Sequence, residues 1–172
     1  MTLKNQPVLK IPSTILEKIS TVLSLLLLIL NVIYLLIQWG ELPNQVPIHF
    51  GVTGEADGWG GKGMIWFLPI MAFLLWIGLT LLERVPHLHN YSGLTEENVE
   101  SQYRNSRMML NVMKTEIIIF MVLGSYQSVQ VAHGHQFGLG IWELPIFLGV
   151  MFSTMGFFMY RAFKLKQTSD SL

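Results

Sequence analysis

The chain has 172 residues, of which 51% are hydrophobic and 13% are charged, whereas a soluble domain usually carries about 25% charged residues. Lys plus Arg number 11, as do Asp plus Glu, so the formal net charge is zero, which excludes a nucleic-acid-binding protein held by bulk positive charge and a disordered tail of one charge sign. The absence of cysteine excludes disulfides, thiolate metal sites and a cysteine nucleophile, and the composition predicts a single-domain integral membrane protein, residues 1–172.

The first predicted transmembrane helix covers residues 15–39 and contains no charged residue from Ile19 to Trp39. A helix needs about 20 apolar residues to cross about 30 Å of hydrocarbon, and this run is long enough. Thr14 and Glu17 have the spacing of a capping box, in which each side chain accepts a hydrogen bond from the backbone N–H of the other residue. No small-residue cleavage site follows the run, so we expect an uncleaved anchor and not a signal peptide.

The connection at residues 40–62 is rich in proline, glycine and aromatic residues. Pro43 and Pro47 restrict the backbone, and the segment 46–50 fits a short extended strand. The Asp57-Gly58 pair favours a turn. A connection of this length without long secondary structure is uncommon unless it is functional or disordered, and its aromatic and proline content argues against disorder. We therefore expect an ordered loop.

The remaining predicted spans are 63–82, 113–132 and 144–160. The third span carries Lys114 and Glu116 near its start; the lysine can snorkel to the membrane surface, and the glutamate needs a partner inside the bundle. Gly124, Gln127 and Ser128 cluster on one side of the same span. Small and polar residues of this kind favour close helix packing, with a polar pathway as the alternative.

Basic residues mark one side of the four spans. They occur in the N-terminal segment, in the loop 83–112 and in the C-terminal tail, whereas the loop 40–62 holds only Lys62 and the connection 133–140 holds none. Because cytoplasmic segments carry an excess of Lys and Arg, we expect both termini to be cytoplasmic. Within the cytoplasmic loop, Thr95 can cap a helix that continues into the third span. The predicted fold class is an all-α membrane protein with four transmembrane helices and an ordered outer loop between the first two. The expected location is the cell membrane.

An ordered pattern runs through the outer loop: Leu42-Pro43, Val46-Pro47-Ile48-His49-Phe50, Gly54-Glu55, Asp57, Trp59-Gly60 and Lys62. Together with cytoplasmic residues such as Asn90-Tyr91 and Arg107, it resembles a bacterial membrane domain of unknown function that forms the N-terminal part of SdpI-type immunity proteins. The resemblance covers roughly Leu42 to Lys114. It implies a four-helix membrane unit that in some relatives protects against a secreted toxic peptide, and it implies no catalytic residues.

The candidate site residues lie in the two outer connections. Ligand-contacting or loop-shaping roles are expected for five residues of the first connection: His49, Glu55, Asp57, Trp59 and Lys62. Imidazole and carboxylate groups also suit Zn²⁺ or another divalent ion, and the candidate metal ligands are His49, Glu55, Asp57, His133 and His135. The two histidines of the second connection point the same way if that segment is extended. The alternative is structural, with Asp57 capping a turn and Lys62 neutralising Glu55 or Asp57.

Three functional hypotheses remain open. The first is a recognition surface outside the cell, for immunity or resistance to a secreted toxic peptide or for envelope signalling; the acidic outer connections would attract a cationic peptide. The second is a divalent-metal-binding protein or metalloenzyme, although the chain lacks a His-Glu-x-x-His helix, a nucleophile elbow and a phosphate loop, which disfavours an enzyme. The third is a transporter subunit or accessory, whose intramembrane polar residues are Glu116 and Gln127. The expected partners are the lipid bilayer, an extracellular peptide, and a membrane protein or second copy, but no nucleic acid.

Overall fold

The computed structural model describes residues 6–135 and 140–170. Residues 136–139 of the predicted outer connection 133–140 lie outside these ranges, as does Lys4 of the basic N-terminal segment. The elements, in chain order, are α1 (Ile15–Gln38), β1 (Gln45–Phe50), β2 (Ala56–Gly61), the short 3₁₀ helix η1 (Lys62–Trp66), α2 (Phe67–Glu83), η2 (Pro86–Leu88), α3 (Val99–Ala132), η3 (Gly140–Trp142) and α4 (Glu143–Asp170).

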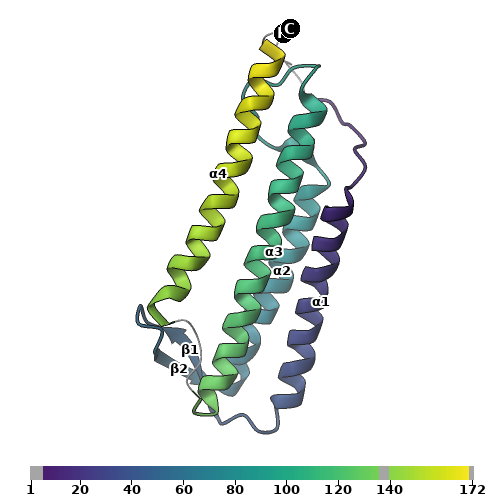
Figure 1. Ribbon diagram of the computed structural model, residues 1–172. Helices are drawn as coiled ribbons and strands as arrows, with labels where there is room; N and C mark the ends of the chain where they lie inside the picture. The colour runs from purple at the N-terminus through teal and green to yellow at the C-terminus, as the bar shows by residue number, and fades with distance from the viewer. Residues whose placement is uncertain (1–5, 136–139, 171–172) are drawn as a thin grey trace.

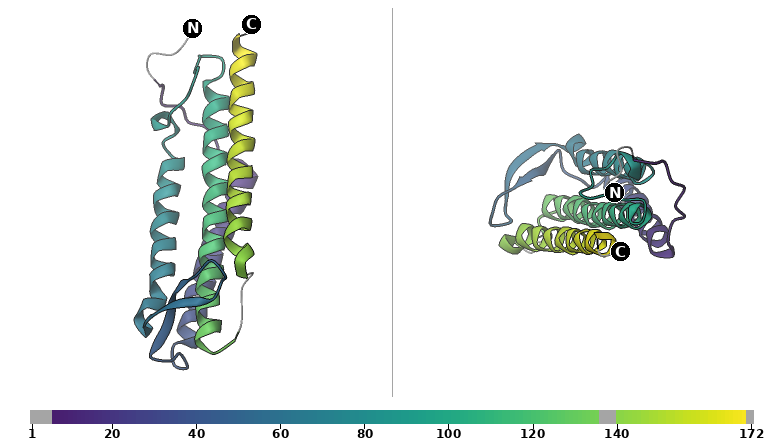
Figure 2. Two further views of the ribbon diagram at one scale, coloured as in Figure 1. Left: turned by 90° about the vertical axis from the view of Figure 1, so that its left-hand side faces the viewer. Right: turned by 90° about the horizontal axis from the view of Figure 1, so that it is seen from above.

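The four long helices form an elongated bundle with α3 at its centre (Figure 1). Helix α3 packs against α1, α2 and α4, whereas α4 rests mainly on α3. Seen from above, α3 lies between α4 and α2 (Figure 2). The β-hairpin lies at one end of the bundle and both chain termini lie at the other. We call these the hairpin end and the terminal end.

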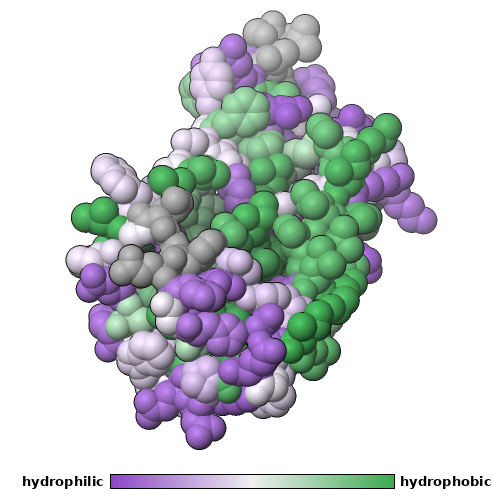
Figure 3. All heavy atoms as spheres, turned by 60° about the horizontal axis from the view of Figure 1, so that its bottom comes forward, coloured by the Kyte–Doolittle hydropathy of each residue, from purple (hydrophilic) through white to green (hydrophobic). Residues whose placement is uncertain are grey.

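The structure confirms the predicted fold class. Within the described ranges, four helices are long and apolar enough to cross a membrane, with mean hydropathies between 1.5 and 2.5. Large apolar side chains point outward from them, for example Leu26, Leu30, Ile33, Phe73, Leu74 and Phe152. Such a surface is unfavourable in water and suits lipid. Polar side chains gather instead over the hairpin end (Figure 3). The chain is therefore a multi-pass membrane protein.

The first helix begins as its sequence predicts. The Thr14 backbone N–H donates to Glu17 Oε2 at 2.6 Å, and the Glu17 N–H donates to Thr14 Oγ1 at 3.2 Å. These two bonds form the complete capping box, which satisfies backbone donors that the first turn leaves free.

Helix α3 is much longer than the predicted third span. It begins at Val99, so residues 99–112 of the predicted cytoplasmic loop 83–112 belong to α3, and residues 84–98 connect α2 to α3. The expectation that a helix of this segment runs into the third span is confirmed, but its N-cap residue is Asn98 and not Thr95. The Thr95 N–H donates to Asn98 Oδ1 at 2.8 Å, and the Asn98 N–H donates to Thr95 Oγ1 at 3.3 Å.

The polar first half of α3 is helical because its side chains find partners on neighbouring helices. Gln102 Nε2 donates to the backbone carbonyl of Ala162 at 2.9 Å, and Asn105 Nδ2 donates to that of Phe158 at 3.0 Å. Helix α4 correspondingly continues to Asp170, beyond the predicted limit of residue 160. Hydropathy alone does not reveal these extensions, because they depend on polar contacts between helices.

Buried apolar residues form three layers along the bundle. The layer at the hairpin end contains Leu35, Leu42, Val46, Ile65 and Val129. The middle layer contains Leu28, Ala72 and Ile118, with Trp76 packed against it. The layer at the terminal end contains Leu94, Val99 and Tyr103. The first of these layers joins the hairpin to the helices and so positions the candidate site.

Candidate functional site

The predicted outer loop is an ordered β-hairpin that lies against the bundle (Figure 1). Strands β1 and β2 pair antiparallel, with Gln45 opposite Gly61 and Pro47 opposite Trp59. The expected extended segment 46–50 lies within β1. The hairpin is held by burial, because Val46 is fully buried against Leu35 and Val129 of the helices. Burying such side chains is worth about 1.5–3 kcal/mol each.

Two glycines determine how the hairpin sits. Gly54 at the tip has a φ of +80°, and a Cβ there would lie 2.4 Å from Cα of Gly140. Gly58 lies opposite His49, and a Cβ there would lie 2.9 Å from the Cβ of His49. Glycine is required at both positions, at the first for the left-handed backbone and at both for the close approach. The tip of the hairpin is thus seated against the start of η3.

His49 and Asp57 form a pair across the hairpin. His49 Nδ1 hydrogen-bonds to Asp57 Oδ1, and the two side chains are 71% and 54% exposed. An exposed pair of this kind contributes about 0–1 kcal/mol. The pair therefore steadies the two strands and leaves most of both side chains accessible to a ligand. Glu55, in the turn beside them, is also exposed.

Lys62 does not take the predicted electrostatic role. Its Nζ lies 4.8 Å from the centre of the Trp39 ring, in a cation–π contact. Within the part of the chain that the structure describes, Lys62 forms no ion pair with Glu55 or Asp57. Trp59, the remaining candidate of the loop, is 49% exposed on β2. Tryptophans at this level suit the boundary between lipid and water.

The two histidines of the second connection are arranged differently from the prediction. They follow α3, with His133 as its C-cap residue, and Gly134 between them has a φ of +82°, so the segment turns and is not extended. The rings of His133 and His135 lie 6.5 Å apart at 75° to each other. His135 Nδ1 bonds to Gln130 Oε1 at 2.9 Å, and Gln130 Nε2 donates to the Tyr34 hydroxyl at 3.0 Å. This chain of contacts ties α3 to α1.

The five candidate metal ligands do not converge in the structure. Among residues 6–135 and 140–170, no three side chains of the types His, Asp and Glu are grouped so that they could hold a metal ion. His49 pairs with Asp57, His135 bonds to Gln130, and the buried Nε2 of His133 has no hydrogen-bond partner among the described residues. The described geometry therefore offers pairs of possible ligands, whereas a Zn²⁺ site takes three or four.

A groove of about 570 Å³ lies beneath the hairpin, bounded by β1, the start of α2, the second half of α3 and the start of α4. Its walls are mostly apolar and include Ile48, Phe50, Met64, Phe67, Phe120 and Leu144. Polar groups enter it from three elements, namely His49, Gln127, Ser128 and Glu143. An apolar concavity with a few convergent polar groups is the usual form of a ligand site.

The carboxylate of Glu143 is held at the wall of this groove. Gln127 is 2% exposed, and with its amide nitrogen turned toward α4 it donates to both carboxylate oxygens of Glu143, at 2.9 and 3.0 Å. The other intramembrane candidate, Glu116, lies away from the groove and faces α4, where it accepts a hydrogen bond from Thr154 at 2.6 Å. Sequence reasoning identified Gln127 but missed its partner, because Glu143 reads locally as a residue that complements a helix N-terminus.

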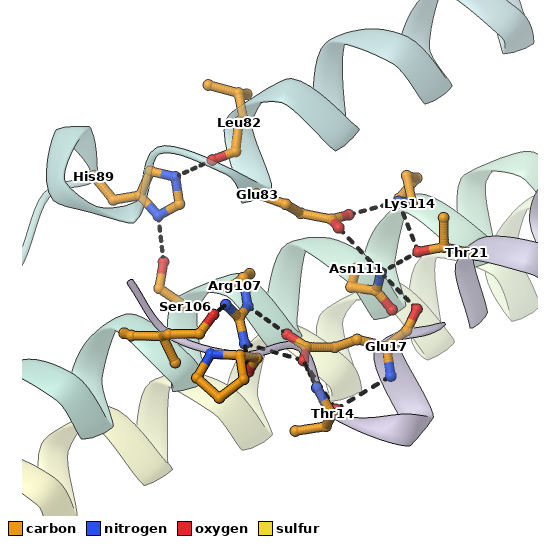
Figure 4. Close-up of polar contacts among 12 residues, drawn as sticks. Thr14, Glu17, Thr21, Leu82, Glu83, His89, Ser106, Arg107, Asn111 and Lys114 are labelled. Carbon is orange, nitrogen blue, oxygen red and sulfur yellow. Dashed lines mark hydrogen bonds and ion pairs between the residues drawn. The ribbon is translucent and has the colours of Figure 1, made fainter. Parts of the chain in front are cut away.

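A second polar cluster, at the terminal end, was not predicted as a unit (Figure 4). Arg107 of α3 donates through Nε to Glu17 Oε1 at 2.7 Å and through Nη2 to Glu17 Oε2 at 3.1 Å. The Arg107 and Glu17 side chains are only 9% and 5% exposed. Glu17 thus serves its capping box and a buried ion pair at the same time.

The second ion pair of this cluster lies about two turns further along α3 toward the hairpin end. Lys114 Nζ lies 2.7 Å from Glu83 Oε1 and donates to Thr80 Oγ1 at 3.0 Å. Asn111 joins the two pairs, since its Nδ2 donates to Glu83 Oε2 at 3.1 Å and to the Glu17 carbonyl at 3.3 Å (Figure 4). We call Glu17, Glu83, Arg107, Asn111 and Lys114 the charged network.

The snorkelling predicted for Lys114 is wrong, because the side chain is fully buried. The pattern that could have shown this is the spacing of Arg107, Asn111 and Lys114. Residues four and three apart lie on one helix face, and a face that is polar inside a membrane needs partners on the adjacent helices.

These features define a multi-pass membrane protein with a polar hairpin docked on one end of a four-helix bundle. A family model described as "Domain of unknown function (DUF1648)" matches residues 26–73, which run from α1 through the hairpin into α2. Over 76 residues the chain is 32% identical to an uncharacterized protein of Archaeoglobus fulgidus, and this match covers 40% of the chain and 42% of that protein. No solved structure matches the chain.

Proposed function

We propose that the hairpin end faces the outside of the cell and binds a secreted amphipathic peptide, and that the protein thereby gives immunity or resistance to that peptide. The orientation is supported by the basic residues of the terminal end, which include Lys10, Lys18, Arg84, Arg104, Arg161 and Lys164. Lys62 is the lone Lys or Arg of the hairpin segment 40–62. Lys and Arg are enriched on the cytoplasmic side of membrane proteins.

The observation that carries the proposal is the groove beneath the hairpin, with the Glu143 carboxylate fixed at its wall. Its volume of about 570 Å³ lies within the ~300–1,000 Å³ of typical ligand sites, so it holds a few apolar side chains and not a whole peptide. The adjacent carboxylate suits a cationic group on the same ligand. A peptide with neighbouring apolar and basic residues satisfies both features.

The charge of the hairpin end favours the same ligand. This end carries one lysine, Lys62, and four acidic residues, namely Glu41, Glu55, Asp57 and Glu143. Its local charge is therefore −3 with histidine neutral. Glu41, Glu55 and Asp57 are exposed. An acidic surface raises the rate at which a cationic peptide arrives, and added salt weakens this effect.

The comparisons support placing the function at this end. The matched family segment, residues 26–73, contains the whole hairpin but none of the residues of the charged network. The loop pattern also resembles the N-terminal domain of SdpI-type immunity proteins, which is the reason to propose protection against a toxic peptide ahead of envelope signalling.

The buried packing argues against transport along the polar face of α3. The charged network ends at Lys114, and the apolar layer of Leu28, Ala72 and Ile118 follows it along the helices. Ser24 and Thr115 are buried on the near side of that layer, and the buried polar residues Asn31 and Ser125 lie beyond it. A polar solute would have to cross tightly packed hydrocarbon side chains, which is costly.

The test is peptide binding to the full chain in lipid nanodiscs. A panel of secreted cationic amphipathic peptides is titrated against the wild type, Glu143→Gln and the control Glu41→Gln, which removes an acidic residue that does not line the groove. We expect Glu143→Gln to weaken binding about tenfold, equivalent to about 1.4 kcal/mol, and Glu41→Gln to leave it nearly unchanged.

The same variants are then compared in cells challenged with the peptide that binds. Cells with the wild type or Glu41→Gln should survive, and cells with Glu143→Gln should be sensitised. The proposal fails if no peptide of the panel binds or if both substitutions change binding equally. It also fails if cells exposed to the peptide survive equally well with and without the protein.

A further inference from the structure

A second concavity lies at the terminal end, in the region of the charged network. It is an open cleft of about 790 Å³ between the N-terminal segment, the first two turns of α1 and the last turn of α2. The N-terminal wall, residues 7–13, is an ordered strap. Tyr103 donates to the Pro7 carbonyl at 3.1 Å, and Arg107 donates to the Ile11 and Pro12 carbonyls at 2.7 and 2.9 Å.

The ion pairs of the charged network determine the net charge that the cleft presents. Glu17 and Glu83 both line it, but Arg107 neutralises the first and Lys114 the second. Three further cations line the same cleft and are exposed, namely Lys10, Lys18 and Arg84. In the described part of the chain none of the three forms an ion pair. The cleft therefore presents uncompensated positive charge.

Apolar side chains surround these cations. Val8 and Val22 line the cleft and are 75% and 65% exposed. On the outward face of α1, Ile15 and Ile19 are 75% and 58% exposed. A phosphate group within reach of Lys10, Lys18 and Arg84 would thus have its hydrocarbon neighbours on the lipid-facing surface of α1. A soluble phosphate would leave that surface unused.

We propose that this cleft binds the headgroup of an anionic phospholipid, with its acyl chains along the outward face of α1. Clusters of Lys and Arg at the end of a transmembrane helix attract anionic lipids, and this attraction acts within about a Debye length. The structure adds a shaped receptor for the headgroup, because the strap is fixed to α3 and the carboxylates beside it are neutralised. The site does not depend on the proposed function at the hairpin end.

The experiment measures lipid binding to the full chain in detergent. Phosphatidylglycerol and phosphatidylcholine with the same acyl chains are compared by native mass spectrometry, and glycerol 3-phosphate serves as the soluble probe. The test variant combines Lys10→Gln, Lys18→Gln and Arg84→Gln. The control variant combines Arg104→Gln, Arg161→Gln and Lys164→Gln, which removes the same charge at the same end but away from the cleft.

We expect the wild type to bind phosphatidylglycerol at least tenfold more tightly than phosphatidylcholine, and to bind glycerol 3-phosphate far more weakly than phosphatidylglycerol. Each cation near an anionic lipid strengthens binding about fivefold. The affinity for phosphatidylglycerol should therefore fall roughly 100-fold in the test variant and less than fivefold in the control variant. Lys10→Gln alone, at an exposed position of the strap, should lower the affinity for phosphatidylglycerol about fivefold. This single variant tests the proposal if the triple variant does not fold.

Three results would overturn the proposal. The first is equal binding of the two lipids by the wild type. The second is equal loss in the test and control variants, which would indicate general attraction by the basic end. The third is binding of glycerol 3-phosphate as tightly as phosphatidylglycerol, which would assign the cleft to a soluble phosphate.

Discussion

At the hairpin end, the chain buries apolar residues and exposes its charges, whereas at the terminal end it buries charges and backbone polar groups together. Val46 of the hairpin and Leu35 of α1 are fully buried against each other, whereas His49 and Asp57 of the same hairpin stay exposed. At the other end, Lys114 is fully buried and Glu17 is 4% exposed.

This difference shows which charges are available to a ligand. The buried carboxylates of the terminal end each have a cation within hydrogen-bond distance, so they hold three helices together. Among the described residues, the one ion pair of an acidic residue at the hairpin end is the exposed contact of Asp57 with His49. We infer that the terminal end is the rigid frame and the hairpin end the adaptable surface.

The largest effect should come from Arg107→Leu. This change leaves Glu17 as a buried charge without its partner, which typically costs about 3–5 kcal/mol, and it also removes the donors to the Ile11 and Pro12 carbonyls. The measurement is the free energy of unfolding in bicelles. Arg104→Leu is the matched control, because Arg104 pairs with the exposed Glu100 on the surface of the same helix, and such pairs contribute about 0–1 kcal/mol. Equal losses in the two variants would show that the terminal end is not held by its buried charges.

Lys114→Met should lower the free energy of unfolding by about 3 kcal/mol, somewhat less than Arg107→Leu. It leaves Glu83 buried and unpaired but removes no contact to the strap. The double variant Lys114→Met, Glu83→Gln should regain most of that loss, since replacing both members of a buried ion pair is often nearly neutral. Unfolding measurements on the two single variants and the double variant give the coupling energy directly. Additive losses would mean that Lys114 and Glu83 do not depend on each other.

At the hairpin end, Val46→Ala should destabilise the docking of the hairpin by about 1–2 kcal/mol, from the lost methyl groups and the small cavity that remains. Hydrogen exchange of the β1 amides should accelerate while that of α3 stays unchanged, because the hairpin can open without the helices. Val52→Ala is the control, as Val52 is 86% exposed at the tip. If exchange accelerates over the whole chain, the two ends are one cooperative unit and the contrast between them disappears.

Local sequence patterns predicted the features that depend on neighbouring residues. The capping box of Thr14 and Glu17, the four apolar spans and the extended segment 46–50 all depend on residues a few positions apart, and all are confirmed. The ordered state of the loop also followed from its own prolines and aromatic residues.

Contacts between distant segments could not be predicted in the same way. Arg107 and Glu17 are 90 positions apart, and neither carries a local pattern that identifies the other. The same holds for Gln127 and Glu143, whose contact depends on how α4 lies on α3. For His133 and His135 the reason is conformational, because Gly134 turns the chain and the extended segment that would point both rings the same way does not form.

The smallest expected effect concerns Tyr91, which lies in the segment 84–98 at the boundary of the rigid frame. Burial raises the pKa of the Tyr91 hydroxyl to about 12, from about 10 in the unfolded chain, and the hydroxyl donates to the Pro86 carbonyl at 2.9 Å. Since the neutral form is favoured in the folded state, its contribution is complete below about pH 10 and is lost as the pH rises toward 12. Tyr91→Phe should therefore cost about 0.5–1.5 kcal/mol at pH 8, and less at pH 11, where the wild type itself is weakened. Thermal unfolding midpoints of both proteins across this range test the effect. A difference that stays constant from pH 8 to pH 11 would show that the hydroxyl is open to solvent and that the rigid frame ends before residue 91.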